Sequence, residues 1–150
     1  MSTDTIEREV AIEAPVERVW SLITQAEHLG TWFGEAGADI DLRPGGALEV
    51  RWEGHVLTGV VQTVQPTSLF AFRWRQVETG TDVELAAGNS TLVEFSLTSE
   101  GESTRVRVVE SGFESLDLPV EDQKGLHDGH TEGWRNELGE LAGYAPGVAA

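Results

Sequence analysis

A stripe of large, mostly apolar side chains near the end of the chain constrains the fold more than any other feature. Its members recur at intervals of three or four residues and are Leu126, His130, Trp134, Leu138 and Leu141. This spacing places them on one face of an α-helix. A helix over residues 121–143 would be roughly 35 Å long. Since the chain before it reads largely as strands, we expect the helix to lie across a sheet.

Three glycines run beside this stripe at four-residue spacing: Gly125, Gly129 and Gly133. Each costs about 1 kcal/mol relative to alanine in a helix interior. Two interpretations stay open. Either volume is missing beneath the helix, leaving a cavity for a small molecule, or the first half of the helix is frayed and the firm helix starts near His130.

The segments before this helix carry signals of their own. Ile6, Val10 and Ile12 alternate with other residues and predict a first strand. A helix that begins at Pro15 and a second short helix over residues 26–32 follow. Alternation and turn residues then predict strands over residues 48–52, 55–64, 70–74, 91–97 and 104–108, with a long loop over residues 76–89.

Length and charge restrict the classes of function. A chain of 150 residues fits one domain over residues 1–150. Its net charge of −16, from 10 basic and 26 acidic residues, opposes nucleic-acid phosphates and anionic lipids, so we expect neither as a partner. The start of the chain lacks a signal-peptide pattern and no apolar stretch is long enough to span a membrane, so we expect a cytoplasmic protein.

The sequence offers little for catalysis or metal binding. The absence of cysteine excludes disulfides and thiolate chemistry. His127 and His130 are three residues apart and could share a metal, but no third ligand is evident, so we expect neither a metal nor a cofactor. No nucleophile elbow or phosphate-binding glycine loop is present. Two carboxylates facing a cavity could perform acid–base chemistry, but the sequence does not single them out among 26 acidic residues.

Large aromatic residues are more informative, because rigid rings either fill a core or line a pocket for apolar ligands. Which face of its strand Trp52 takes depends on the strand register. The candidate ligand-binding residues are Trp32, Phe33, Trp52, Phe72, Trp74, Phe113, His130 and Trp134.

Four motifs stand out along the chain: Ile12 to Trp20 (IEAPVERVW), Trp32-Phe33-Gly34, Pro44-Gly45-Gly46, and Gly133-Trp134 with Leu138, Leu141 and Tyr144. Together with the order of elements, these motifs resemble the START-like helix-grip (SRPBCC) superfamily, in particular the branch of activators of heat-shock-protein ATPase. The resemblance implies an α+β helix-grip domain. In it, a curved antiparallel sheet of about six strands wraps a long C-terminal helix, two short helices follow the first strand, and a cavity lies between sheet and helix.

Members of this superfamily bind or transform lipids, polyketides, hormones and antibiotics, so the fold alone does not fix the function. We expect a monomer or homodimer that binds a small hydrophobic or amphipathic molecule in the cavity. The alternatives are an enzyme of the cyclase, hydrolase or dehydratase kind that acts on such a ligand, and a chaperone-interacting module. A cavity sealed by apolar residues would favour binding, whereas paired polar groups with perturbed pKa values inside it would favour an enzyme. A large exposed apolar patch without a cavity would favour a partner-binding module.

Overall fold

A computed structural model describes residues 4–77 and 84–147 of the chain. Strand β1 (Thr5–Ile12) leads into helices α1 (Val16–Thr24) and α2 (Ala26–Trp32). The strands that follow are β2 (Ala38–Ile40), β3 (Ala47–Trp52), β4 (His55–Gln65), β5 (Leu69–Arg75), β6 (Ser90–Glu100) and β7 (Ser103–Ser111). A short 3₁₀ turn η1 (Phe113–Ser115) precedes the long helix α3 (Val120–Tyr144), and a second turn η2 (Ala145–Gly147) follows it.

The seven strands form one antiparallel sheet in the order β1-β7-β6-β5-β4-β3-β2. Strands β3 to β7 pair with their neighbours in sequence, whereas β1 returns to pair with β7, from Thr5 opposite Ser111 to Ile12 opposite Thr104. The register of β4 shifts between Val61 and Thr63, and such a bulge bends the strand and increases its twist. The sheet is therefore curved.

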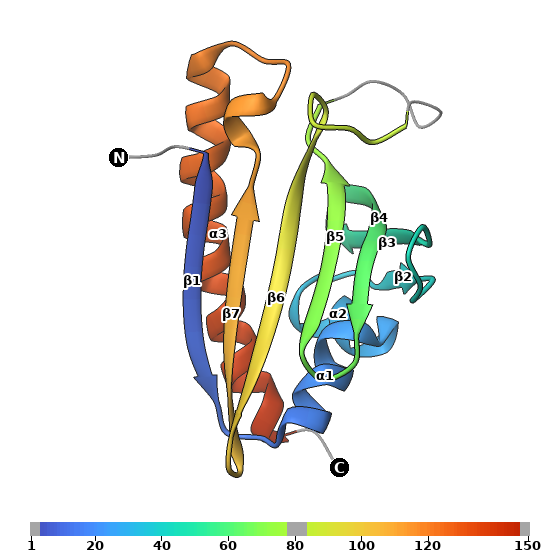
Figure 1. The fold of residues 1–150 in the computed structure, drawn as a ribbon, viewed down its shortest axis with the longest axis vertical. Helices are drawn as coiled ribbons and strands as arrows, with labels where there is room; N and C mark the ends of the chain where they lie inside the picture. The colour runs from blue at the N-terminus through green and yellow to red at the C-terminus, as the bar shows by residue number, and fades with distance from the viewer. Residues whose placement is uncertain (1–3, 78–83, 148–150) are drawn as a thin grey trace.

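All three helices lie on the same side of this sheet (Figure 1). Helix α3 runs behind β1 and β7, while α1 contacts β6 and β7, and α2 contacts β2 and β3. The end of α3 is joined to α2 by a hydrogen bond of 2.8 Å between Tyr144 Oη and His28 Nδ1. Helix α2 also lies close to β2, since a side chain at Gly30 would place its Cβ 2.6 Å from the backbone nitrogen of Ala38.

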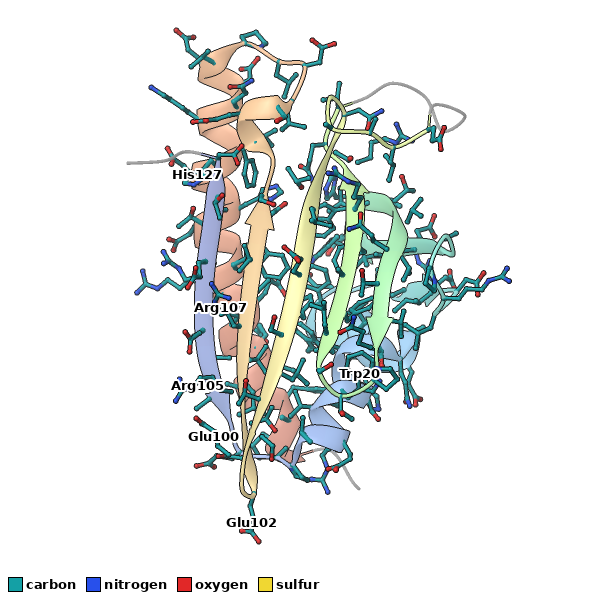
Figure 2. The ribbon with its side chains drawn as sticks, viewed as in Figure 1. Trp20, Glu100, Glu102, Arg105, Arg107 and His127 are labelled. Atoms are coloured by element: carbon teal, nitrogen blue, oxygen red, sulfur yellow. The ribbon has the colours of Figure 1, made fainter. Side chains whose placement is uncertain are left out.

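The two faces of the sheet differ in chemistry because neighbouring residues of a strand point to opposite sides. In β7, Val106 and Val108 face the helices and are fully buried. Arg105 and Arg107 alternate with them, and Figure 2 shows both along this strand. Arg105 pairs with Glu9 at 3.3 Å and Arg107 with Glu7 at 2.7 Å, so the outer face is covered by ion pairs.

The predicted fold class is confirmed: a curved antiparallel sheet, two short helices after the first strand, and a long C-terminal helix. The sheet has seven strands because β2 adds a three-residue edge strand, too short to produce an alternation signal. Helix α3 is continuous from Val120, so the frayed-helix interpretation is wrong. Of the predicted loop over residues 76–89, residues 78–83 lie outside the described part of the chain. No helix in the described ranges has both the length and the apolar character needed to cross a membrane.

Candidate functional site

A buried carboxylate lies where the sheet meets helix α3. In β7 the inward-facing positions run Thr104, Val106, Val108 and Glu110, so strand alternation places Glu110 inside the protein. Its side chain has no exposed surface. Burial of a charged group is costly unless hydrogen bonds replace the lost water.

Four donors supply those hydrogen bonds to Glu110. Oε1 accepts from His130 Nδ1 at 2.8 Å and from the indole of Trp134 at 2.8 Å. Oε2 accepts from the indole of Trp74 at 2.9 Å and from the hydroxyl of Thr91 at 2.6 Å. Two carboxylate oxygens offer about four acceptor positions. Every acceptor position of Glu110 is therefore occupied.

These contacts determine the ionisation of Glu110. Burial by itself raises the pKa of the carboxyl, but the hydrogen bonds and charge of His130, with the hydrogen bonds of Thr91 and Trp74, outweigh it and lower the pKa. An ionised carboxylate only accepts, so His130 Nδ1 must carry a hydrogen. The second ring nitrogen of His130, Nε2, takes no part in this hydrogen bond.

Aromatic rings fill the space between α3 and the sheet next to Glu110. The ring of Phe33 stacks on Trp74, with centroids 5.6 Å apart and planes inclined by 20°. The ring of Phe33 also stacks on Trp134, with centroids 5.4 Å apart and planes inclined by 8°. Trp52 meets Phe33 edge-on at 5.1 Å. The ring of Phe33 thus packs against three tryptophans, Trp52, Trp74 and Trp134.

A pocket with a volume of about 240 Å³ opens beside this stack, between α3 and the β3–β4 hairpin. Its wall is mainly aromatic and apolar, and it consists of Phe33, Trp52, His55, Leu57, Trp74, Gly129, His130, Gly133, Trp134 and Glu137. A Cβ atom built at Gly129 or Gly133 would have no neighbour within 4 Å. The glycine stripe therefore borders open space at this point of the helix.

Glu137 is the one acidic residue in the pocket wall. Its Oε2 atom is buried and has no hydrogen-bond partner among the described residues. Burial raises the pKa of Glu137 to about 8, and the negative charges of Glu140 and Glu35 contribute in the same direction. Glu137 is therefore mostly protonated at neutral pH.

The structure brings together five of the eight candidate ligand-binding residues: Phe33, Trp52, Trp74, His130 and Trp134 all line the pocket. The other three lie elsewhere. Trp32 donates its indole N–H to Leu22 O at 2.6 Å. Phe72 is fully buried among other rings, and Phe113 packs edge-on against His127 and His130.

Sequence reasoning missed Glu110, Glu137, His55 and Leu57. Glu110 could have been found, because it continues the buried alternation of Val106 and Val108. Glu137 follows Trp134 by three residues and His130 by seven, which places it on the same helix face. His55 and Leu57 depend on the curvature of the β3–β4 hairpin, for which the sequence has no local signal.

The two neighbouring histidines of α3 do not converge on one point. His127 Nε2 lies 3.1 Å from the carbonyl oxygen of Thr5, whereas His130 Nδ1 binds Glu110. Within residues 4–77 and 84–147, no three histidine or carboxylate side chains come together as metal ligands would.

Replacing Glu110 with glutamine tests the role of the buried carboxylate. The amide NH₂ of Glu110→Gln would face two donors in place of an acceptor oxygen, leaving them unpaired in the core. We expect the free energy of unfolding to fall by roughly 2–4 kcal/mol in a denaturant titration. The exposed control Glu102→Gln at the β6–β7 turn should change it by less than about 0.5 kcal/mol. Equal stability of the two variants would contradict this role.

Replacing Glu137 with glutamine tests its raised pKa. Because the folded protein holds this proton more tightly than the unfolded chain, the stabilising contribution of Glu137 is present at low pH and is lost as pH rises towards about 8. Between about pH 5 and pH 9, Glu137→Gln should gain roughly 1–2 kcal/mol of stability relative to the natural protein, a value reduced because the side chain is only partly buried. The exposed control Glu132→Gln should show the same dependence of stability on pH as the natural protein. If the difference in stability between Glu137→Gln and the natural protein does not change with pH, the pKa of Glu137 is not raised.

Comparison with known proteins places this architecture in context. A family model described as "Activator of Hsp90 ATPase homolog 1-like protein" matches residues 13–145. A search of curated proteins gives no match.

Several solved structures share the fold. Protein MLL2253 from Mesorhizobium loti has a TM-score of 0.78 at 22% identity, covering 97% of this chain and 99% of that one. The Aha1 dimer from Colwellia psychrerythraea has a TM-score of 0.72 at 18% identity, and the match covers 94% of this chain and 95% of that one. DynU16, described as a putative protein in the dynemicin biosynthetic locus, gives 0.69 at 26% identity, covering 94% of this chain and 46% of that one.

The family match extends over most of the chain, from the end of β1 through α3. The chain therefore belongs to the family of Activator of Hsp90 ATPase homolog 1-like proteins.

Proposed function

We propose that this protein binds a small hydrophobic or amphipathic molecule in the pocket between α3 and the β3–β4 hairpin. The observation that carries the proposal is the largely aromatic and apolar wall of this pocket, which includes Gly129 and Gly133. Gly129 and Gly133 border open space, although each costs about 1 kcal/mol relative to alanine in a helix. No neighbouring atom requires a glycine at either position. A ligand in the adjacent space would explain why glycine occupies both positions.

The composition of the wall supports the same function. Small-molecule sites are concave and mostly apolar, with a few polar groups that orient the ligand. Here Trp52, Trp74 and Leu57 supply apolar surface, and the polar groups are His55, His130 and Glu137. The proposed site also includes tryptophans whose fluorescence reports on occupancy.

Filling the pocket should weaken binding without unfolding the protein. In Gly129→Leu the new side chain enters the open space, so we expect the affinity for the neutral probe N-phenylnaphthylamine to fall about tenfold or more, a loss of about 1.4 kcal/mol. Because leucine is a better helix former than glycine, the free energy of unfolding should not decrease. Tryptophan quenching measures the affinity, and denaturant titration measures the stability.

Gly125→Leu is the matched control. This residue lies one turn earlier on α3, borders open space as well, and is not part of the pocket wall. It should bind the probe as the natural protein does. Unchanged affinity in Gly129→Leu, or no binding by the natural protein, would contradict the proposed function.

A second candidate function, an enzyme of the cyclase, hydrolase or dehydratase kind, is favoured by two groups in the same pocket wall. The Nε2 atom of His130 is not used in the hydrogen bond to Glu110, which Nδ1 makes, so it is the atom of this ring that can exchange a proton with a ligand. Glu137 holds its proton at neutral pH and can act as an acid. They are separated by seven residues, about 10 Å along the helix axis.

Proton exchange in D₂O distinguishes catalysis from binding. If His130 and Glu137 act together, the methyl protons of acetylnaphthalene should exchange for deuterium faster with the protein than in buffer, as followed by NMR. Glu137→Met should abolish the acceleration, because it removes the acid. The absence of any acceleration in the natural protein would leave binding as the function.

A third candidate, interaction with a chaperone, is favoured by the family description and by the likeness to the Aha1 dimer. That likeness is also the basis for proposing a homodimer as well as a monomer in solution. Addition of the protein to a purified Hsp90 would raise its ATPase rate if this function is correct. An unchanged rate would exclude it for that chaperone.

A further inference from the structure

We propose that Glu137 selects the ligand by donating a hydrogen bond to a carbonyl oxygen, so that the pocket takes neutral aromatic molecules bearing a ketone or related acceptor. This inference rests on the binding function proposed above and names the chemical class of the ligand. Glu137 lines this mainly apolar pocket, and its buried Oε2 atom makes no hydrogen bond within the described ranges.

The position of Glu137 on α3 explains how it reaches the pocket. Trp134 precedes it by three residues, so the two side chains share one helix face, and both line the pocket. A buried polar group without a partner costs free energy that a suitable ligand atom would recover. The ligand should therefore carry one polar group opposite Glu137 and apolar surface elsewhere.

The charges around Glu137 decide between an acceptor and a donor on the ligand. Glu137 shares the proposed site with His55 and His130. It also borders a second pocket on the other side, whose charged residues are Glu140 and Arg135 on the same helix and Glu35 from the segment after α2. Burial and the two carboxylates together favour the neutral acid, which donates a hydrogen bond. A carbonyl oxygen is the matching acceptor.

A cationic ligand is the competing possibility, since ammonium groups bind carboxylates and the faces of aromatic rings. In this pocket the ring of Phe33 packs against Trp74 and Trp134, with centroids 5.6 and 5.4 Å away. Trp74 also stacks on Trp134, with centroids 5.9 Å apart. Ring faces engaged with each other are poorly placed to surround a cation, which favours the neutral ligand.

Three probes of similar shape test the proposal: acetylnaphthalene, isopropenylnaphthalene, in which CH₂ replaces the carbonyl oxygen, and naphthylmethylamine, which is cationic. Their affinities are measured by tryptophan quenching at about pH 7 and about pH 9.5, below and above the pKa of Glu137 of about 8. At the lower pH we expect the ketone to bind about five- to tenfold tighter than the alkene, the range of one buried hydrogen bond. At the higher pH this preference should disappear, because the ionised Glu137 no longer donates.

Two substitutions separate the hydrogen bond from the shape of the pocket. Glu137→Gln keeps a donor that does not ionise, so its ketone preference should persist at both pH values. Glu137→Met has no donor and should bind both neutral probes equally. Glu132→Gln, an exposed carboxylate on the same helix, is the matched control and should behave like the natural protein. Circular dichroism verifies that each variant is folded.

The outcomes distinguish this inference from the function on which it rests. If no probe binds the natural protein, the binding function itself is wrong. If both neutral probes bind equally well to the natural protein and to Glu137→Met, the pocket binds ligands but Glu137 does not select them. Tightest binding of the amine at about pH 7, where it is cationic, would overturn the proposal in favour of a cation site.

Discussion

The carboxylate of Glu110 is the interaction on which the rest of the structure depends. Its donors come from three other elements: Trp74 from β5, Thr91 from β6, and His130 and Trp134 from α3. Hydrogen bonds have narrow geometric requirements, whereas apolar contacts tolerate sliding. Four such bonds to one buried group therefore fix the rotation of α3 and its position along the sheet.

The pocket is a consequence of that fixed helix. With His130 and Trp134 held at Glu110, the neighbouring face of α3 must present Gly129, Gly133 and Glu137 to the β3–β4 hairpin. The same indoles that bind the carboxylate also take part in the ring stack with Phe33. Glu110 and its donors thus support both the core and the proposed binding site. A substitution of Glu110 should therefore alter the packing of both.

Elements with a strong repeating pattern could be predicted from the sequence, while features that depend on distant segments could not. The stripe from Leu126 to Leu141 predicted α3, and turn residues such as Pro44-Gly45-Gly46 located the ends of strands. The three-residue β2 was missed, because its pairing with Leu48 to Val50 provides most of its order. Aromatic residues were recognised as candidates, but only the tertiary structure separates Trp74 at the pocket from Phe72 in the core.

The pairing of β1 with β7 has a consequence for how the chain folds. Residues 5 and 111 are direct partners, so β1 can join the sheet only when the two ends of this long segment meet. Helix α3 also packs on β1, so its full packing on the sheet requires that this strand is in place. Contacts between residues so distant in sequence slow folding because the entropy of closing the loop is lost before the contacts stabilise the chain. We therefore expect the meander from β3 to β7 to form first, and the strand that begins the chain to be among the last elements to join the sheet.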